Sequence, residues 1–241
     1  VPTVPEVQSS AVAAPQQPAP IVGAVEYAPP VASCPAPACA PSCSCTCCTE
    51  EKKEKLKAAA KGAHKPFFYL NDFSYLEDPC YDGHLLGDSL KRLGNDGFKV
   101  DLGGQYRARV HREENHRGLG ITGGDDDFLL HRLRLYLNAE IGENIRFYGE
   151  TLHADSNYES LGIRPIEENH FDLQNLFVDV KLLDGDRGKL VARAGRQEIG
   201  IGNQRYVSPL DWANTRRTFD GGRLIYSNDD WNIDGFWLAT T

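Results

Sequence analysis

The chain has 241 residues, with 34 acidic against 26 basic side chains and a net charge of −8. This acidity argues against nonspecific nucleic-acid binding, which depends on a basic surface. No apolar run reaches the roughly 18 residues of a transmembrane helix.

Residues 1–49 form a segment rich in proline and alanine, with Glu6 and Glu26 as its only charges. Such a composition cannot bury a core, so we expect a disordered, extended segment. The next residues, 50–66, are rich in glutamate, lysine and alanine and favour a helix. Because this stretch lacks an apolar stripe, we expect a solvated, marginal helical linker that ends at Gly62.

Six of the seven cysteines lie close together: Cys34, Cys39, Cys43, Cys45, Cys47 and Cys48. Their spacing differs from the paired C-x-x-C pattern of a zinc site. In an oxidising envelope they can form disulfides or cross-links, whereas reduced thiolates can bind a soft metal. We favour cross-linking or anchoring to an envelope partner. The seventh cysteine, Cys80, is expected to pair with this cluster or to be buried.

Residues 67–96 are rich in aromatic residues, glycine and aspartate, which predicts turns and short packed segments. From residue 98 onward, apolar and polar residues alternate, as the two faces of a β-strand require. The first such run, 98–110, has 13 residues, where an ordinary strand has about 5–6. Further runs follow at 129–141, 145–151, 174–182 and 231–239.

These runs predict an all-β fold, and two architectures fit them. A transmembrane barrel needs strands of about 9–11 residues, apolar toward lipid and polar toward the lumen. A soluble antiparallel sandwich would instead turn the apolar face to a core. We expect about six to eight strands, fewer than the roughly 16–18 of a porin with a water channel. The chain also lacks methionine and ends at Thr241 directly after a strand pattern, so we expect a processed or truncated piece.

Arginines stand inside the predicted strands: Arg107, Arg109, Arg132, Arg134, Arg146 and Arg193. An arginine facing lipid at mid-depth costs about 2–4 kcal/mol, so in a barrel these residues must face the lumen. Rows of guanidinium groups there would favour an anionic solute. Alternatively, each arginine pairs with a carboxylate across the strands. The candidate partners are Asp101, Glu140, Glu150 and Asp179.

Other polar clusters predict no catalytic or cofactor site. His111 and His116 lie beside Glu113 and Glu114, but a polar loop explains this spacing better than a metal site. The run 125–127, all aspartate, lacks the glycine and the distal glutamate of an EF-hand loop and predicts a charged turn. No nucleotide-binding glycine pattern or G-x-S-x-G elbow occurs. We therefore predict neither an enzyme nor a cofactor.

The most specific motifs are Gly195-Arg196-Gln197-Glu198, Gly202-Asn203-Gln204-Arg205 and Asn214-Thr215-Arg216-Arg217-Thr218-Phe219-Asp220-Gly221. They resemble the alginate export family of bacterial outer-membrane porins. Shorter segments within 71–83, 125–132 and 165–169 resemble a planctomycete-type branch of that family. The resemblance covers roughly residues 67–241.

This resemblance implies an antiparallel transmembrane β-barrel, of which 67–241 would be the N-terminal part. Its arginine-lined lumen would pass an anionic polysaccharide, or small polar or anionic solutes, across the outer membrane. The expected partners are outer-membrane lipid and the solute, with the N-terminal segment in the periplasm. Further lumen-lining candidates near the motifs are Arg196, Arg205, Arg216 and Arg217.

Two other hypotheses belong to different classes. One is a soluble or surface carbohydrate-binding β-sandwich that uses Trp212, Trp231 and Tyr226 as platforms for sugar rings. The other is a metal-buffering cysteine tail on a structural protein. Detergent dependence separates the porin from the sandwich, and the thiol-to-metal ratio of residues 34–48 tests the tail.

Overall fold

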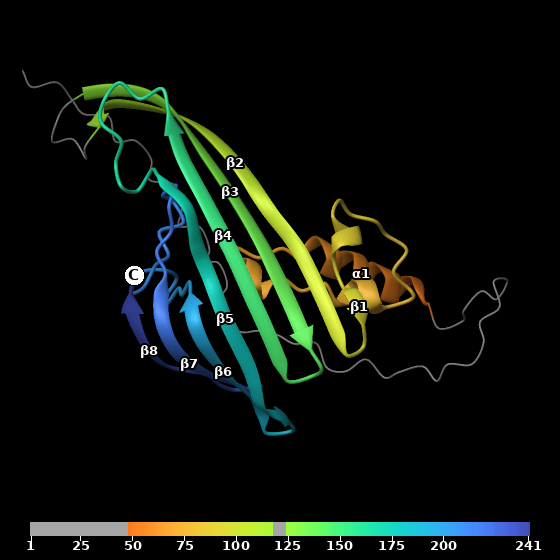
Figure 1. Cartoon of the computed structure of the whole chain (residues 1–241). Coiled ribbons are helices and arrows are strands. Elements are labelled where there is room, and N and C mark those ends of the chain that lie inside the picture. The colour runs from red at the N-terminus through yellow and green to blue at the C-terminus, as the bar shows by residue number, and fades with distance from the viewer. Residues whose placement is uncertain (1–47, 118–123) are drawn as a thin grey trace, which may run out of the picture.

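The structure, a computed structural model, describes residues 48–117 and 124–241 (Figure 1). The expected disordered segment 1–49 lies outside the described residues except for its last two positions. The same holds for five of the clustered cysteines: Cys34, Cys39, Cys43, Cys45 and Cys47.

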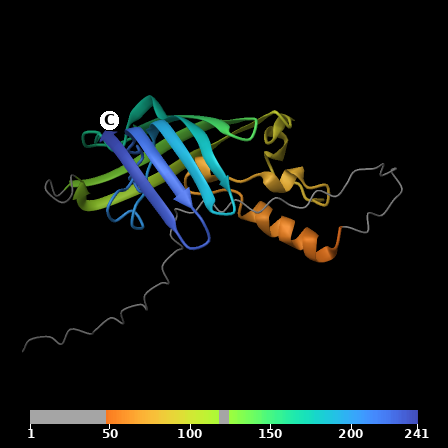
Figure 2. The same cartoon turned by 90° about the horizontal axis from the view of Figure 1, so that it is seen from below.

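One antiparallel sheet of eight strands dominates the molecule, and each strand pairs with its neighbours in sequence. The strands are β1 (Leu93–Asn95), β2 (Phe98–Arg117), β3 (Gly124–Ile141), β4 (Ile145–Asn157), β5 (Asn169–Gly185), β6 (Gly188–Gln197), β7 (Phe219–Ser227) and β8 (Asn232–Thr240). The sheet is strongly curled (Figures 1 and 2). Among the described residues β8 pairs only with β7, so the sheet stays open. The all-β antiparallel prediction is confirmed, but the described strands do not close a barrel.

The two ends of the sheet differ in their connections. At one end, called here the short-turn end, β3 passes into β4 through residues 142–144 and β5 into β6 through 186–187. At the opposite, long-loop end, residues 158–168 join β4 to β5, and residues 198–218 join β6 to β7. This asymmetry is typical of outer-membrane strands.

The two faces of the sheet differ in chemistry because side chains alternate along each strand. The inner face is the one covered by residues 67–71 and 198–218. The outer face is the other, and its apolar residues remain exposed: Leu102, Leu133, Leu135, Leu137, Phe147, Leu176, Val178, Val180, Leu182 and Leu224. On β3 the burial alternates residue by residue, with Leu133, Leu135 and Leu137 exposed and the intervening side chains buried. The predicted two-faced strands are confirmed.

The region before the sheet consists of short elements, as predicted. These are α1 (Glu50–Lys61), η1 (Phe68–Leu70), η2 (Ser74–Glu77) and η3 (Asp88–Leu90). Thr49 caps α1 by accepting a hydrogen bond from the Lys52 amide, and Gly62 ends the helix.

Most of helix α1 is solvent-exposed, as expected, but one side of it packs against residues that follow in the chain. Leu56 and Ala60 lie one turn apart, and Ala60 is buried in a cluster with Phe73 and Tyr75. Two apolar residues form too narrow a stripe for the sequence pattern to predict a buried face in this highly charged helix. The aromatic residues that cover it come from later in the chain, so only the tertiary structure reveals the contact.

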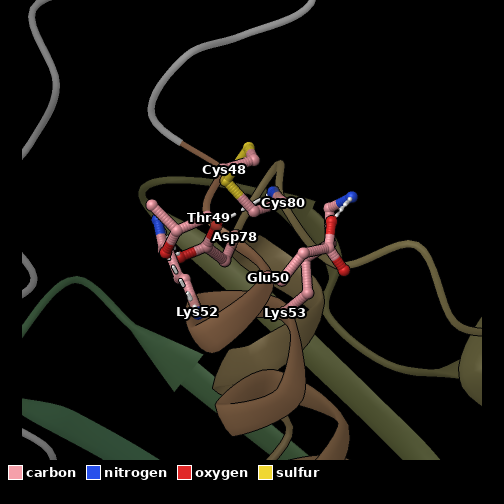
Figure 3. The surroundings of a disulfide bond; sticks show 7 residues. All are labelled: Cys48, Thr49, Glu50, Lys52, Lys53, Asp78 and Cys80. Carbon is pink, nitrogen blue, oxygen red and sulfur yellow. Dashed lines mark hydrogen bonds and ion pairs between the residues drawn. A yellow bond between two sulfur atoms is a disulfide. The ribbon is translucent and has the colours of Figure 1, made fainter.

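A disulfide between Cys48 and Cys80 joins the start of α1 to the segment after η2 (Figure 3), with a Cα–Cα distance of 5.4 Å. The sequence left two alternatives for Cys80, pairing with the cluster or burial, and Cys80 both pairs with Cys48 and is buried. Asp78 supports the junction by accepting from the Cys80 amide at 2.9 Å and from Lys52 Nζ at 2.9 Å. Burial opposes ionisation of Asp78, but these two donors more than offset it and lower its pKa.

Candidate functional site

The six strand arginines lie on the inner face, as their alternation predicted. Register places Arg107 opposite Arg132 across β2 and β3. Further round the sheet, Asp179 on β5 lies between Arg146 on β4 and Arg193 on β6. The remaining two, Arg109 and Arg134, share the faces of Arg107 and Arg132 on their strands. The inner face therefore carries an arginine on each strand from β2 to β6 except β5.

An aromatic segment, residues 67–71 and called here the strap, crosses the inner face. Beneath it, Tyr136, Tyr148 and Phe177 from three adjacent strands stack with ring centroids 6.0 and 5.1 Å apart. Phe68 packs on Tyr136 at 5.5 Å, and Tyr69 packs on Phe177 at 5.5 Å. Burying aromatic rings is strongly favourable, so the strap is held against the sheet.

The strap also covers three of the arginines. The Arg134 guanidinium lies 4.1 Å from the centroid of the Phe68 ring, and that of Arg193 lies 4.7 Å from the Tyr69 ring. Arg146 donates to the Tyr69 carbonyl. These contacts combine cation–π attraction with hydrogen bonding and leave the three arginines little contact with water.

The covered arginines are paired with carboxylates. Arg193 makes a two-pronged contact with Asp179, with N–O distances of 2.7 and 2.9 Å. Arg146 lies 3.6 Å from the same Asp179, and Arg134 lies 2.5 Å from Glu150. For these three arginines the structure shows the cross-strand pairing that the sequence left as an alternative.

A buried charge network connects the sheet with residues 198–218. Glu198 is fully buried and accepts from Arg134 at 3.2 Å and from Gln174 at 3.1 Å. Arg216 from the same long connection also contacts Glu198. The Tyr148 hydroxyl donates to Glu150 at 2.9 Å and completes the network. Buried charges need such partners, because an unpaired buried charge is strongly destabilising.

Asn214 anchors the same connection at a second point. Its side-chain amide donates to the backbone carbonyls of His131 and Glu167, both at 2.8 Å. Glu198, Asn214 and Arg216 all belong to the motifs singled out in the sequence. Their roles in the structure are therefore to hold residues 198–218 against the inner face.

The other three arginines, called here the arginine triad, are Arg107, Arg109 and Arg132. They donate to backbone carbonyls: Arg107 to Ala213 at 2.8 Å, Arg109 to Trp212 at 2.9 Å and Arg132 to Ala213 at 3.4 Å. Among the described residues no carboxylate lies within 4.0 Å of them. The Nε atom of each is buried and has no hydrogen-bond partner there.

The pKa of Asp211 reflects the positive charge of the arginines around it. Burial acts to raise the pKa of its carboxyl, but the charges of Arg216, Arg132 and Arg107 outweigh burial and lower it. One partly exposed carboxylate in contact with Arg216 cannot neutralise three further guanidinium groups. The triad is therefore an excess of positive charge with unused donors, which suits a carboxylate or phosphate group.

The four motif arginines do not line one surface with the triad. Arg196 lies on the outer face, where it pairs with Asp220 at 2.9 Å. It stands three positions after inner-face Arg193, and an odd spacing in a strand reverses the face. Arg216 is buried in the network, and Arg205 and Arg217 are exposed in residues 198–218.

Other sequence-based expectations have mixed outcomes. The predicted charged turn at residues 125–127 is wrong, because these aspartates begin β3. The polar loop predicted around His111 and Glu113 is also wrong, because both residues lie within β2, where Glu113 pairs with Arg164 at 2.9 Å. The side chain of His116 lies outside the described residues. Trp212 lies in the long-loop connection and Trp231 at the opposite end of the sheet, so they form no common sugar platform.

Within the described residues no helix is long and apolar enough to span a membrane. No curated protein and no solved structure matches the chain. A family model described as "Alginate export" matches residues 98–240, which is β2 through the end of β8 and more than half of the chain. The chain therefore belongs to the alginate export family, a family of outer-membrane transport proteins rather than enzymes.

Proposed function

We propose that this chain forms part of the wall of an outer-membrane porin that passes an anionic polysaccharide or smaller anionic or polar solutes. The opposite chemistry of the two faces supports a membrane wall. Leu133, Leu135 and Leu137 are exposed on the outer face, whereas Arg132 and Arg134, which alternate with them, are buried on the inner face. A soluble sandwich would have to cover that apolar surface, and in the described residues it is bare.

The open edge of the sheet fits the same proposal. Backbone groups at the edges of a sheet must be hydrogen-bonded inside a bilayer, so only closed barrels are stable there. We propose that additional strands pair with the free edge of β8 and complete the barrel. The N-terminal segment would then lie on the periplasmic side, since α1 and β1 lie at the short-turn end (Figure 1).

The arginine triad is the observation that supports an anionic solute. Its guanidinium groups are held in place by the Trp212 and Ala213 carbonyls yet have no carboxylate partner among the described residues. A uronate carboxylate entering from the long-loop end would meet donors that are already ordered. Such preorganised donors bind an anion with little loss of side-chain entropy.

A cavity at the short-turn end offers a second cationic surface. It has a volume of about 260 Å³. Its charged lining has more basic than acidic side chains: Arg92, Arg146, Lys181, Lys189 and Arg193 against Glu140, Glu143 and Asp179. We propose that an anion passes from the triad toward this surface along the inner face.

Single-channel recording tests the proposal. The full-length protein would be reconstituted in a planar bilayer, and current block by a uronic-acid oligomer would be titrated. The double variant Arg107→Gln/Arg109→Gln should weaken block at least about tenfold, the loss expected for two charge-assisted contacts of this kind. Arg196→Gln is the matched control, because it removes an arginine from the outer face. Equal block in both variants, or a protein that is monodisperse without detergent, would refute the proposal.

A further inference from the structure

Three metal-ligating side chains meet at the long-loop end of β4 and β5, away from the inner-face arginines. They are Asp155 near the end of β4, Glu168 just before β5, and His170 within β5. Their position follows from the register, in which Ala154 pairs with Asn169. The residues on either side of that pair are therefore brought together across the two strands.

The geometry is close to that of a metal site. One ligand atom from each of Asp155, Glu168 and His170 lies within 4.8 Å of the other two. The His170 Nε2 and Asp155 Oδ1 atoms are already 3.5 Å apart. Bond lengths of about 2.0–2.2 Å place neighbouring ligands of a tetrahedral zinc ion about 3.4 Å apart. The Glu168 ligand atom lies within 4.8 Å of both, so a small side-chain movement would complete the set.

In this cluster Asp155 contacts His170, but neither carboxylate has a lysine or arginine partner among the described residues. Elsewhere in the chain, Glu150, Asp179 and Glu198 are each neutralised by an arginine. By contrast, among the residues that the structure describes, no lysine or arginine lies within 4.0 Å of Asp155 or Glu168. Two carboxylates this close together repel each other unless a cation lies between them.

A second histidine, His153, lies beside the cluster. The His153 ring lies 5.2 Å from the His170 ring, centroid to centroid, and supports it from the side. Its Nδ1 atom is buried and has no hydrogen-bond partner within the described part of the chain. The His170 side chain is 55% exposed, which leaves an open side for water or an external ligand.

We propose that Asp155, Glu168 and His170 bind a divalent transition-metal ion, and that Zn²⁺ fits this set of one imidazole and two carboxylates. Calcium and magnesium prefer oxygen ligands alone, so the imidazole selects against them. The bound ion would link the end of β4 to the start of β5 on the outer face, above the apolar band. It would thereby fix residues 158–168 to the sheet.

Isothermal titration with ZnCl₂ tests the site directly. The full-length protein, in detergent, would be stripped with a chelator and its free thiols alkylated, because the cysteines before Cys48 can bind zinc themselves. We expect one zinc site of micromolar affinity. Asp155→Asn and His170→Gln should each weaken it at least tenfold, whereas His84→Gln, in an exposed turn, should leave it unchanged.

Thermal unfolding gives a second measurement on the same samples. Zinc should raise the melting temperature of the parent protein and of His84→Gln but not that of His170→Gln, because a ligand stabilises only the state that binds it. Absence of zinc binding in the alkylated parent protein would overturn the proposal. So would unchanged zinc affinity in both Asp155→Asn and His170→Gln. Neither result depends on channel activity, so the site is tested separately from the porin function.

Discussion

Replacing Glu198 by glutamine tests the buried charge network most sharply. Glu198 has no exposed surface and accepts hydrogen bonds from Arg134, Gln174 and Arg216. Glutamine preserves the shape but removes the charge, and it points an amide group of donors at neighbours that are themselves donors. The change therefore separates the electrostatic contribution of the carboxylate from its packing.

The expected loss follows from the partners that remain. Arg134 keeps Glu150 at 2.5 Å, but Arg216 keeps only Asp211, whose side chain is 49% exposed. Removing one partner of a buried ion pair lowers the free energy of unfolding by about 3–5 kcal/mol. Because Arg134 and Arg216 each keep one carboxylate partner, we expect a loss of about 3 kcal/mol here. With a denaturant slope of about 3 kcal/mol per molar, the urea midpoint should fall by about 1 M.

Urea titration of the detergent-solubilised protein, followed by tryptophan fluorescence, measures this shift. Trp212 lies in residues 198–218 and reports release of that connection from the sheet. Glu143→Gln, in the exposed turn between β3 and β4, is the matched control. A midpoint for Glu198→Gln no lower than that of Glu143→Gln would show that the network contributes no net stability, and the reasoning would fail.

Three more predictions concern the region before the sheet. Tyr69→Ala removes the ring contacts of Tyr69 to Tyr148 and Phe177 and should weaken the packing of the strap on the sheet by about 3–5 kcal/mol. Because the strap crosses the inner face, this variant should raise the single-channel conductance. An unchanged conductance would mean that the strap does not narrow the path of the solute. Cys80→Ser removes the disulfide that joins residues 32 positions apart and should lower the free energy of unfolding of this region by about 3–4 kcal/mol. Trypsin should then cleave α1 faster than in the parent protein. Equal resistance to trypsin in the two proteins would contradict this prediction. The carboxyl of Asp78 has a lowered pKa, so its stabilisation of α1 is present above its unfolded pKa of about 4 and is lost as the pH falls further. The protection factors of the α1 amides, which correct for the intrinsic pH dependence of exchange, should therefore fall in acid, and Asp78→Asn should abolish that fall. Protection factors in the parent protein that do not change with pH would argue against it.

The alternation of residue types by itself determined the strands and their faces. A strand has a period of two, so the run from Phe98 to Val110 already separates an apolar side from a charged one. The same rule explains why Arg107, Arg109 and Arg132 share a face, and applying it to Arg193 and Arg196 would have placed those two on opposite faces. The motifs around Glu198 and Arg216 likewise determined the family, since they are local in sequence.

Only the tertiary structure decided which charges are neutralised and which remain available. Arg134 and Arg132 stand two positions apart on the same face of β3, yet one meets Glu150 and Glu198 and the other meets only carbonyl and amide oxygens. The difference lies in what strand pairing and residues 198–218 bring to each position, up to 81 residues away in the chain for Arg132. For the same reason the Cys48–Cys80 disulfide, the packing of α1 and the cluster at Asp155 follow from contacts between distant segments, which no local pattern encodes.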